Sequence, residues 1–222
     1  MMHALNYLGP LLKGAEITAI IAVASTALGA VLAFAAGIAR ASGGWLLAGI
    51  AIIYVEIFRG TSLLVQLFWL YYALPLLGFS MDPIMTGIIG LALNIGAYGA
   101  EVVRGAILAV PNDQHEAARA LNLPRRHTLW RIVLPQAVVE MMPPFANLAV
   151  QNLKDTALVS MITITDLTFR AQELRNLTLD SVPIYIETLL LYFAVALVVM
   201  GVMRWLESRL RHGAAIPRVR MA

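Results

Sequence analysis

The sequence contains no cysteine and few charged residues. None of its 222 residues is cysteine, which excludes disulfide bonds and thiolate metal ligands. Charged residues make up only 13% of the chain, 60% is hydrophobic, and the mean hydropathy is +0.78. Ordinary soluble domains carry about twice that share of charge. The composition therefore predicts an integral membrane protein.

Sequence motifs for nucleotide binding, catalysis and metal binding are also missing. The chain has no G-x-x-x-x-G-K-[ST] loop, with which many ATPases hold nucleotide phosphates. It shows no nucleophile–base constellation at helical spacing, and its four histidines lack metal-ligand spacing. The net charge of +3 comes with no recognisable nucleic-acid module. We expect no catalytic residue, no metal site, no cofactor bound by this chain and no nucleic-acid partner.

Long uncharged segments are present instead. Residues 17–39, 60–81 and 83–100 contain no charge, and about 20 apolar residues suffice for a helix to cross a bilayer. Two further segments are less regular, because Glu140 and Pro143-Pro144 interrupt one and Glu187 lies near the start of the other. We predict an all-α fold, a single transmembrane domain over residues 1–222. Its five spans cover roughly 16–40, 56–78, 83–105, 132–153 and 181–205.

The basic residues predict how these spans are oriented, because loops rich in Lys and Arg stay in the cytoplasm. One orientation places twelve of the sixteen basic residues inside: Arg40, Arg59, Arg104, Arg119, Arg125, Arg126, Arg131, Arg204, Arg209, Arg211, Arg218 and Arg220. It leaves Lys13, Lys154, Arg170 and Arg175 outside. We therefore expect the N-terminus outside and the C-terminus in the cytoplasm.

A basic island, "HEAARALNLPRRHTLWRIVLPQA" (His115 to Ala137), separates the third and fourth predicted spans. Asp113 and Glu116 have the spacing of a capping box, which predicts a helix start near Asp113. Asn122 tolerates the left-handed conformation that often ends a helix, and Pro124 fits the first position of a second helix. The segment 112–135 is thus predicted to form a short helix, a sharp bend and a second helix through Trp130. Ala117, Ala118 and Leu121 are expected to form a small apolar face on the first helix.

These residues resemble the cytoplasmic signature of the membrane subunits of ATP-binding-cassette (ABC) importers. That signature begins Glu-Ala-Ala, has Gly four positions after its last Ala, and ends Ile-x-Leu-Pro; this chain departs from it only in having Asn122 for Gly. The resemblance implies a coupling helix that docks on a cytoplasmic ATPase subunit. The residues that it assigns to this coupling are Asp113, Glu116, Ala117, Ala118, Leu121, Asn122, Ile132, Leu134 and Pro135. In the plainer alternative, Glu116 only caps a helix in an interfacial loop.

Three longer segments are similar to the polar amino-acid permease branch of that family: Tyr54 to Pro75, Leu93 to Ile107 and Asn152 to Arg175. The resemblance implies a type I, MetI-like permease of the bacterial inner membrane. It also implies a homodimeric or heterodimeric pore, two ATPase subunits that use ATP and Mg, and a solute-binding protein outside. The segments are similar, too, to permeases for ectoine and hydroxyectoine.

Polar residues at membrane depth are the candidates for handling solute, because an ionisable group there costs roughly 2.5–3.5 kcal/mol. The candidates are Gln66, Asn94, Tyr98, Glu101, Asn147, Gln151, Lys154, Asp155 and Thr156. Two of these assignments each have an open alternative. Glu101 instead forms an ion pair with Arg104 at the cytoplasmic end, and Lys154 and Asp155 instead form a gate without contacting substrate. Hydrogen-bond donors and a cation among these residues can meet the carboxylate of a zwitterionic solute, and the acceptors can meet its positively charged group. The alternative function is an autonomous secondary transporter or channel for small polar solutes.

Overall fold

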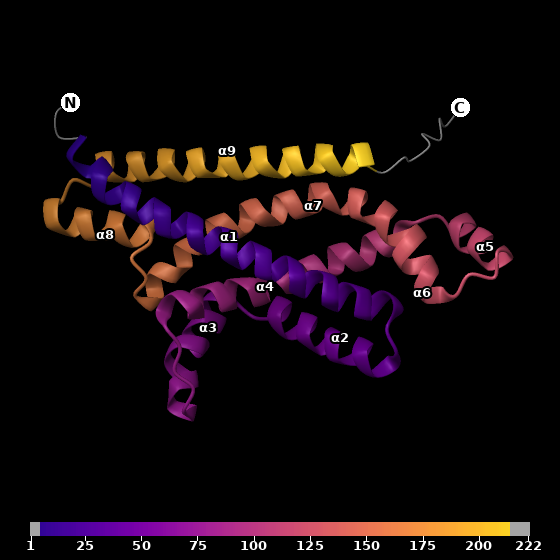
Figure 1. Ribbon diagram of the computed structural model, residues 1–222. Helices are drawn as coiled ribbons and strands as arrows, with labels where there is room; N and C mark the ends of the chain where they lie inside the picture. The colour runs from indigo at the N-terminus through magenta and orange to yellow at the C-terminus, as the bar shows by residue number, and fades with distance from the viewer. Residues whose placement is uncertain (1–4, 214–222) are drawn as a thin grey trace.

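The computed structural model describes residues 5–213, which form helices and turns without any β-strand (Figure 1). The predicted all-α class is therefore confirmed. Arg218 and Arg220, used to orient the chain, lie outside the described residues. The α-helices are α1 (Leu5–Ser42), α2 (Trp45–Gly60), α3 (Leu63–Phe68), α4 (Pro83–Ala109), α5 (Asn112–Ala120), α6 (Arg125–Thr128), α7 (Leu134–Asp155), α8 (Leu167–Thr178) and α9 (Ser181–Gly213). Shorter π or 3-10 segments are η1 (Trp69–Ala73), η2 (Leu74–Leu77), η3 (Leu129–Val133) and η4 (Thr156–Ile162).

Three of the described helices are long and apolar enough to cross a membrane: Tyr7–Ser42, Pro83–Ala109 and Ser181–Arg211. The region of the predicted second span, 56–78, is not one straight helix. There the chain bends by 105° between α2 and the segment Leu63–Leu77. These two segments together count as a fourth span if they are treated as a single, bent one. The region 132–153 lies mostly within α7, which continues through Pro143 and Pro144 and is not among the apolar spans.

Helices α1 and α4 share the most extensive contact in the described chain. Small residues allow it, since a Cβ added at Gly96 would lie 2.9 Å from the Leu32 Cβ, and one added at Gly99 would lie 2.6 Å from the Ala33 Cβ. The hydrophobic effect does not favour the pairing of helices within lipid. Much of the attraction between them comes from the van der Waals contacts that close backbone approach allows. This pair forms the centre against which α2, α7 and α8 pack.

The long helices α1, α4, α7 and α9 run lengthwise, and the short helices gather at the two ends (Figure 1). Helix α8 lies beside the beginning of α1, whereas α5 and α6 project at the opposite end, where α9 finishes. Helix α9 is mostly exposed, with 6% of its most apolar window buried. The fold therefore presents α5 and α6 together, clear of the helical body.

Candidate functional site

Helix α5 begins one residue earlier than expected, and the predicted capping box at Asp113 is wrong. Pro111 is the N-cap, with an extended backbone (φ −55, ψ 141) and no side-chain cap bond. Asn112 takes the first helical position, so Asp113 lies within the first turn and cannot cap it. Its carboxylate there still faces the positive end of the helix dipole.

The end of α5 forms as predicted, with Asn122 in the left-handed conformation (φ 52). The Asn122 N–H donates to the Arg119 carbonyl at 2.9 Å, and the Leu123 N–H donates to the Ala118 carbonyl at 3.0 Å. These two bonds define a Schellman motif, which satisfies carbonyls that a helix end leaves unpaired. The sharp bend after α5 is thus held by local backbone bonds.

The second helix of the island begins at Arg125, with Pro124 at the N-cap and not at the predicted first helical position. The Thr128 N–H donates to the Pro124 carbonyl at 3.0 Å. Helix α6 continues through η3 into α7, so the chain stays helical past Trp130 as expected. Of the remaining signature residues, Ile132 and Leu134 are half-buried, while Pro135 lies exposed in the first turn of α7. These three lie in η3 and the first turn of α7, directly after α6.

The expected apolar face of α5 is divided between two sides of the helix. Ala118 is 1% exposed and faces the protein body, whereas Ala117 is exposed and Leu121 is 72% exposed. Ala117 and Leu121, four positions apart, lie on one side of the helix, and Ala118 is turned about 100° from Ala117. Asp113 and Glu116 are exposed beside them. We call Asp113, Glu116, Ala117 and Leu121 the outer face of α5.

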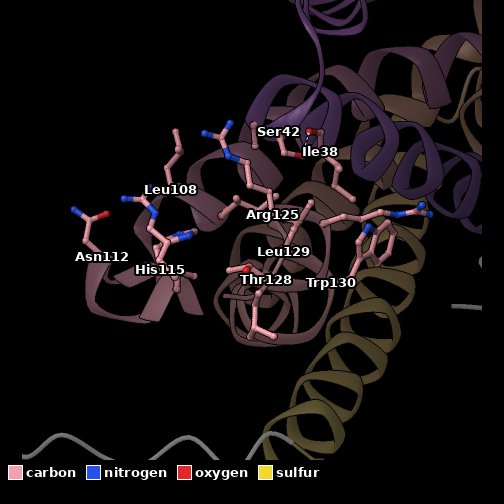
Figure 2. A pocket seen from close by; sticks show the side chains of 15 residues that line it. Ile38, Ser42, Leu108, Asn112, His115, Arg125, Thr128, Leu129 and Trp130 are labelled. Atoms are coloured by element: carbon pink, nitrogen blue, oxygen red, sulfur yellow. Dashed lines mark hydrogen bonds between the residues drawn. The ribbon is translucent and has the colours of Figure 1, made fainter. Parts of the chain in front are cut away.

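A cleft of about 630 Å³ separates the inner side of α5 from the helical body (Figure 2). The last residues of α1 and α4 form one wall, and α5 and α6 form the other. Figure 2 shows His115 and Asn112 of α5 on one side of this space and Trp130 on the other.

Gln66 and Asn94 meet at the bend between α2 and α3. The Gln66 side-chain amide donates to the Phe58 carbonyl at 2.9 Å and to the Thr61 hydroxyl at 2.7 Å. The Asn94 amide donates to the same Phe58 carbonyl at 3.1 Å and to the Gln66 Oε1 at 3.2 Å. A helix break frees carbonyls that cost several kcal/mol when unpaired in lipid, and these two buried amides pair with one of them. Their contacts indicate a structural role at the bend.

Glu101 binds three arginines from three helices. Arg40 at the end of α1 pairs with its Oε1, Arg59 of α2 lies 3.3 Å from the same oxygen, and Arg104 lies 3.0 Å from Oε2. The Glu101–Arg104 pair of the sequence analysis is therefore present, within a larger cluster. The Arg59 guanidinium also lies 5.3 Å from the centre of the Tyr98 ring. The cluster connects the ends of α1, α2 and α4, a role that sequence spacing did not reveal for Arg40 and Arg59.

A polar stripe runs along α7. Asn147, Gln151 and Lys154 are all exposed and follow one another at four- and three-residue spacing, which places them on one helix face. The Gln151 amide donates to Asp155 at 2.9 Å. Thr156 is buried and donates to the Leu153 carbonyl at 2.7 Å, so it does not belong to the stripe.

Asp166 is a capping residue that the sequence analysis did not single out. It lies between η4 and α8, outside the apolar spans, and accepts hydrogen bonds from the N–H groups of Thr168 and Phe169 at 3.2 and 2.9 Å. The Tyr192 hydroxyl donates to it at 3.4 Å. Burial raises the pKa of Asp166 to about 6. An Asp directly before an apolar helix start was the available signal for this cap.

Comparison with known proteins places the chain in a family. The family model for the binding-protein-dependent transport system inner membrane component matches residues 14–212. The chain is 53% identical to a probable amino-acid ABC transporter permease protein of Sinorhizobium fredii over 209 residues, covering 91% of this chain and 88% of that protein. It is 34% identical to the glutamine transport system permease protein GlnP of Escherichia coli over 203 residues, covering 90% and 93%.

A solved structure described as an amino acid ABC transporter with histidines superposes with a TM-score of 0.85 at 29% identity, covering 94% of this chain and 97% of that chain. An inward-facing MetNI methionine ABC transporter shares the fold, with a TM-score of 0.76 at 16% identity over 91% and 97% of the two chains. The chain therefore belongs to the family of binding-protein-dependent transport system inner membrane components and is a multi-pass permease subunit of an ABC importer, not an ATPase.

Proposed function

We propose that this permease carries a polar amino acid, or a related zwitterionic solute, across the bacterial inner membrane when partner ATPase subunits hydrolyse ATP. Membership of the family implies ATPase, solute-binding and second permease partners. In the finer form of the proposal, two ATPase subunits bind ATP and Mg, and the second permease is either a copy of this chain or a sibling. The N-terminus lies outside, and the C-terminus lies in the cytoplasm.

The outer face of α5 is the observation that carries the proposal. Ala118 holds the helix on the body while Glu116, Ala117 and Leu121 remain exposed. Leu121 is a large apolar side chain, 72% exposed at the end of a projecting helix. A helix of about two turns is not stable alone in water, so such a helix is suited to being held between two bodies. We assign α5 as the coupling helix and its outer face as the surface that enters the ATPase.

The translocation pathway is proposed to follow the polar stripe of α7. Asn147, Gln151 and Lys154 combine amide groups with a cation on one exposed face, and such groups suit the carboxylate and ammonium of a zwitterion. Exposed polar groups on a membrane helix are expected to face a water-filled path or another subunit, not lipid. Asp155 and Lys154 stand at the outer end of this path, as substrate contacts or as a gate. Tyr98 and Glu101 stand at the opposite end, near the arginine cluster.

The names of the relatives support the solute class. Besides the glutamine permease, relatives at 36% and 39% identity are named for L-cystine and octopine. A polar amino acid therefore leads the proposal, and ectoine or hydroxyectoine is the alternative zwitterion. The ligand that the companion solute-binding protein retains on purification distinguishes these solutes.

The docking assignment is tested by placing positive charge on the outer face of α5. In the assembled complex, Ala117→Arg combined with Glu116→Lys is expected to abolish co-purification of the ATPase and solute-stimulated ATP hydrolysis. Thermal stability of the permease is expected to stay unchanged, since both side chains are exposed. Ser208→Arg, which adds a charge at the same end of the molecule on exposed α9, is the matched control. A complex that forms and hydrolyses ATP equally well with both variants contradicts the assignment.

A further inference from the structure

The cleft behind α5 combines an apolar floor with a basic rim. Ile38 and Ile107, from the ends of α1 and α4, and Leu129 from η3 contribute apolar side chains to its lining. Arg119 of α5 and Arg125 and Arg126 of α6 line it with positive charge. This pairing of apolar and cationic surfaces is unlike either the outer face of α5 or the stripe of α7.

The three arginines are not neutralised by the protein. Among residues 5–213, no carboxylate lies within 4.0 Å of the guanidinium groups of Arg119, Arg125 or Arg126. The acids of α5, Asp113 and Glu116, are exposed and are not among the residues that line the cleft. Several cations around one low-dielectric concave surface attract an anion strongly. The arrangement thus favours an anionic occupant.

The depth of the cleft identifies the kind of anion. One wall is made by residues at the ends of two membrane-spanning helices, Ile38 and Ser42 of α1 and Ile107 and Leu108 of α4. Both helices are longer than the about 20 residues that cross the hydrocarbon core, so we expect their last turns to extend out of it to the headgroups. Leu108 is 62% exposed and Trp130 is 53% exposed beside the cleft, and exposed Trp at this level is typical of the interface between membrane and water. The cleft therefore opens beside headgroups.

We propose that this cleft binds the phosphate headgroup of an anionic phospholipid. The guanidinium groups of Arg125 and Arg126 pair with phosphate oxygens, for which their planar donor geometry is suited. The apolar surfaces of Leu108 and Trp130 contact the first part of the lipid tails, as their positions around the cleft allow (Figure 2). A volume of about 630 Å³ accommodates a headgroup. The bound lipid braces α5 from its inner side and leaves the outer face free.

This inference goes beyond the proposed function, since it depends on the membrane setting and not on ATPase docking. It is tested with the full-length permease purified in a neutral detergent and offered equal amounts of phosphatidylglycerol and phosphatidylcholine. Native mass spectrometry then measures the lipid that each variant retains. The wild type is expected to prefer phosphatidylglycerol. R125Q/R126Q is expected to lose that retention about tenfold or more, because each basic residue near an anionic surface contributes a factor of about five.

Two control variants separate lipid binding from misfolding and from general charge. R125K/R126K keeps both charges and is expected to retain most of the phosphatidylglycerol. Arg204→Gln removes an exposed charge from α9, which finishes at the same end of the molecule but lies outside the cleft, and is expected to behave as the wild type. Equal retention of phosphatidylglycerol by the wild type and R125Q/R126Q overturns the proposal, as does equal retention of the two lipids.

Two further measurements identify other occupants. Release of phosphatidylglycerol by millimolar inorganic phosphate overturns the lipid assignment in favour of free phosphate; no release is expected. Loss of ATPase co-purification in R125Q/R126Q with unchanged lipid assigns the arginines to the partner chain and also overturns it. If no ATPase co-purifies with the wild-type permease, the proposed function is contradicted. The lipid proposal is still tested, because lipid retention is measured on the permease alone.

Discussion

The helical chain is interrupted after α5 and after α2, and the two interruptions are stabilised in opposite ways. At Asn122 the bend is held by backbone bonds to residues three and five positions earlier. At Thr61-Ser62 the 105° bend is held by side-chain amides, one of which comes from Asn94, 36 residues beyond Phe58. The first bend is therefore a local property of the chain, and the second depends on α4 being in place.

The comparison shows how position in the membrane changes what a bend requires. The bend at Asn122 lies in the exposed island, where water satisfies any carbonyl that the Schellman motif leaves free. The bend after α2 has Gln66 and Asn94 buried beside it, so each free carbonyl needs a partner from the protein. Polar residues at membrane depth thus divide into those that satisfy backbone groups at the bend, such as Gln66 and Asn94, and those that stay exposed, such as Asn147 and Gln151.

The largest expected loss of stability comes from replacing Asn94, which bonds to the bend from α4. Asn94→Leu gives a side chain of similar shape but removes the hydrogen bonds from the Asn94 amide to the Gln66 Oε1 and to the Phe58 carbonyl. Loss of two buried hydrogen bonds is expected to lower the free energy of unfolding by about 3 kcal/mol. Thermal unfolding of the purified permease in detergent measures this loss.

Asn147→Leu is the matched control for that measurement, because Asn147 is exposed on the stripe of α7. It is expected to change stability by less than about 0.5 kcal/mol and to reduce solute uptake by the assembled importer. If Asn94→Leu unfolds at the wild-type temperature, the structural role of Asn94 is wrong, and its place in the translocation pathway is restored.

The second effect compares two acids at helix starts, Asp113 and Asp166. Burial raises the pKa of Asp166 from its ordinary value of 3.8 to about 6. The folded protein therefore binds this proton more tightly than the unfolded chain, and the stabilisation from protonation is present at low pH and lost as the pH rises through about 6. Asp166→Asn keeps a capping oxygen and removes the titration. The stability of Asp166→Asn relative to the wild type is expected to fall by about 2 kcal/mol between pH 7 and pH 4.

The exposed acid supplies the control for the pH measurement. Asp113 is exposed in the first turn of α5, so Asp113→Asn is the matched variant with the same Asp-to-Asn change at a helix start. Parallel unfolding curves for Asp166→Asn and the wild type across that pH range contradict the account of the buried cap.

The smallest effect concerns the local bend. Asn122→Val places a β-branched residue at φ 52 and is expected to cost about 1 kcal/mol, whereas Asn122→Gly is expected to be neutral or slightly stabilising. Because α5 carries the proposed docking face, the Val variant is also expected to weaken ATPase co-purification more than it lowers the unfolding temperature. Equal behaviour of the Val and Gly variants argues that the left-handed turn is not needed.

The fold can be predicted from the sequence where interactions between residues close in sequence determine it. The all-α class, the turn at Asn122 and the helix through Trp130 follow from apolar segments and from residue types that end helices. Helix α2 was not predicted as a separate element, although residues 41–55 are uncharged, because this run is shorter than the about 20 residues that cross a bilayer. The contacts that hold the bend after α2 could not be predicted, because Asn94 is distant in sequence.

The candidate site likewise has features that the sequence predicted and features that depend on contacts between distant residues. The signature residues placed α5 correctly within a residue, but sequence spacing did not show that Ala118 faces inward while Ala117 and Leu121 face outward. Gln66 and Asn94 were grouped with the solute path because amides at membrane depth suit both roles. Their hydrogen bonds to the Phe58 carbonyl show a structural role, while their place in the solute path stays a prediction. Such contacts depend on packing of helices that sequence patterns do not specify.

The central claim is that transport by this chain depends on a partner ATPase acting through α5. The most direct test measures uptake of radiolabelled glutamine into vesicles that hold either the permease alone or the complete importer with its solute-binding protein, with ATP supplied to the ATPase side. The account predicts uptake against a gradient with the complete importer and its loss in the variant carrying Glu116→Lys and Ala117→Arg. Uphill uptake by vesicles that contain the permease alone would contradict it.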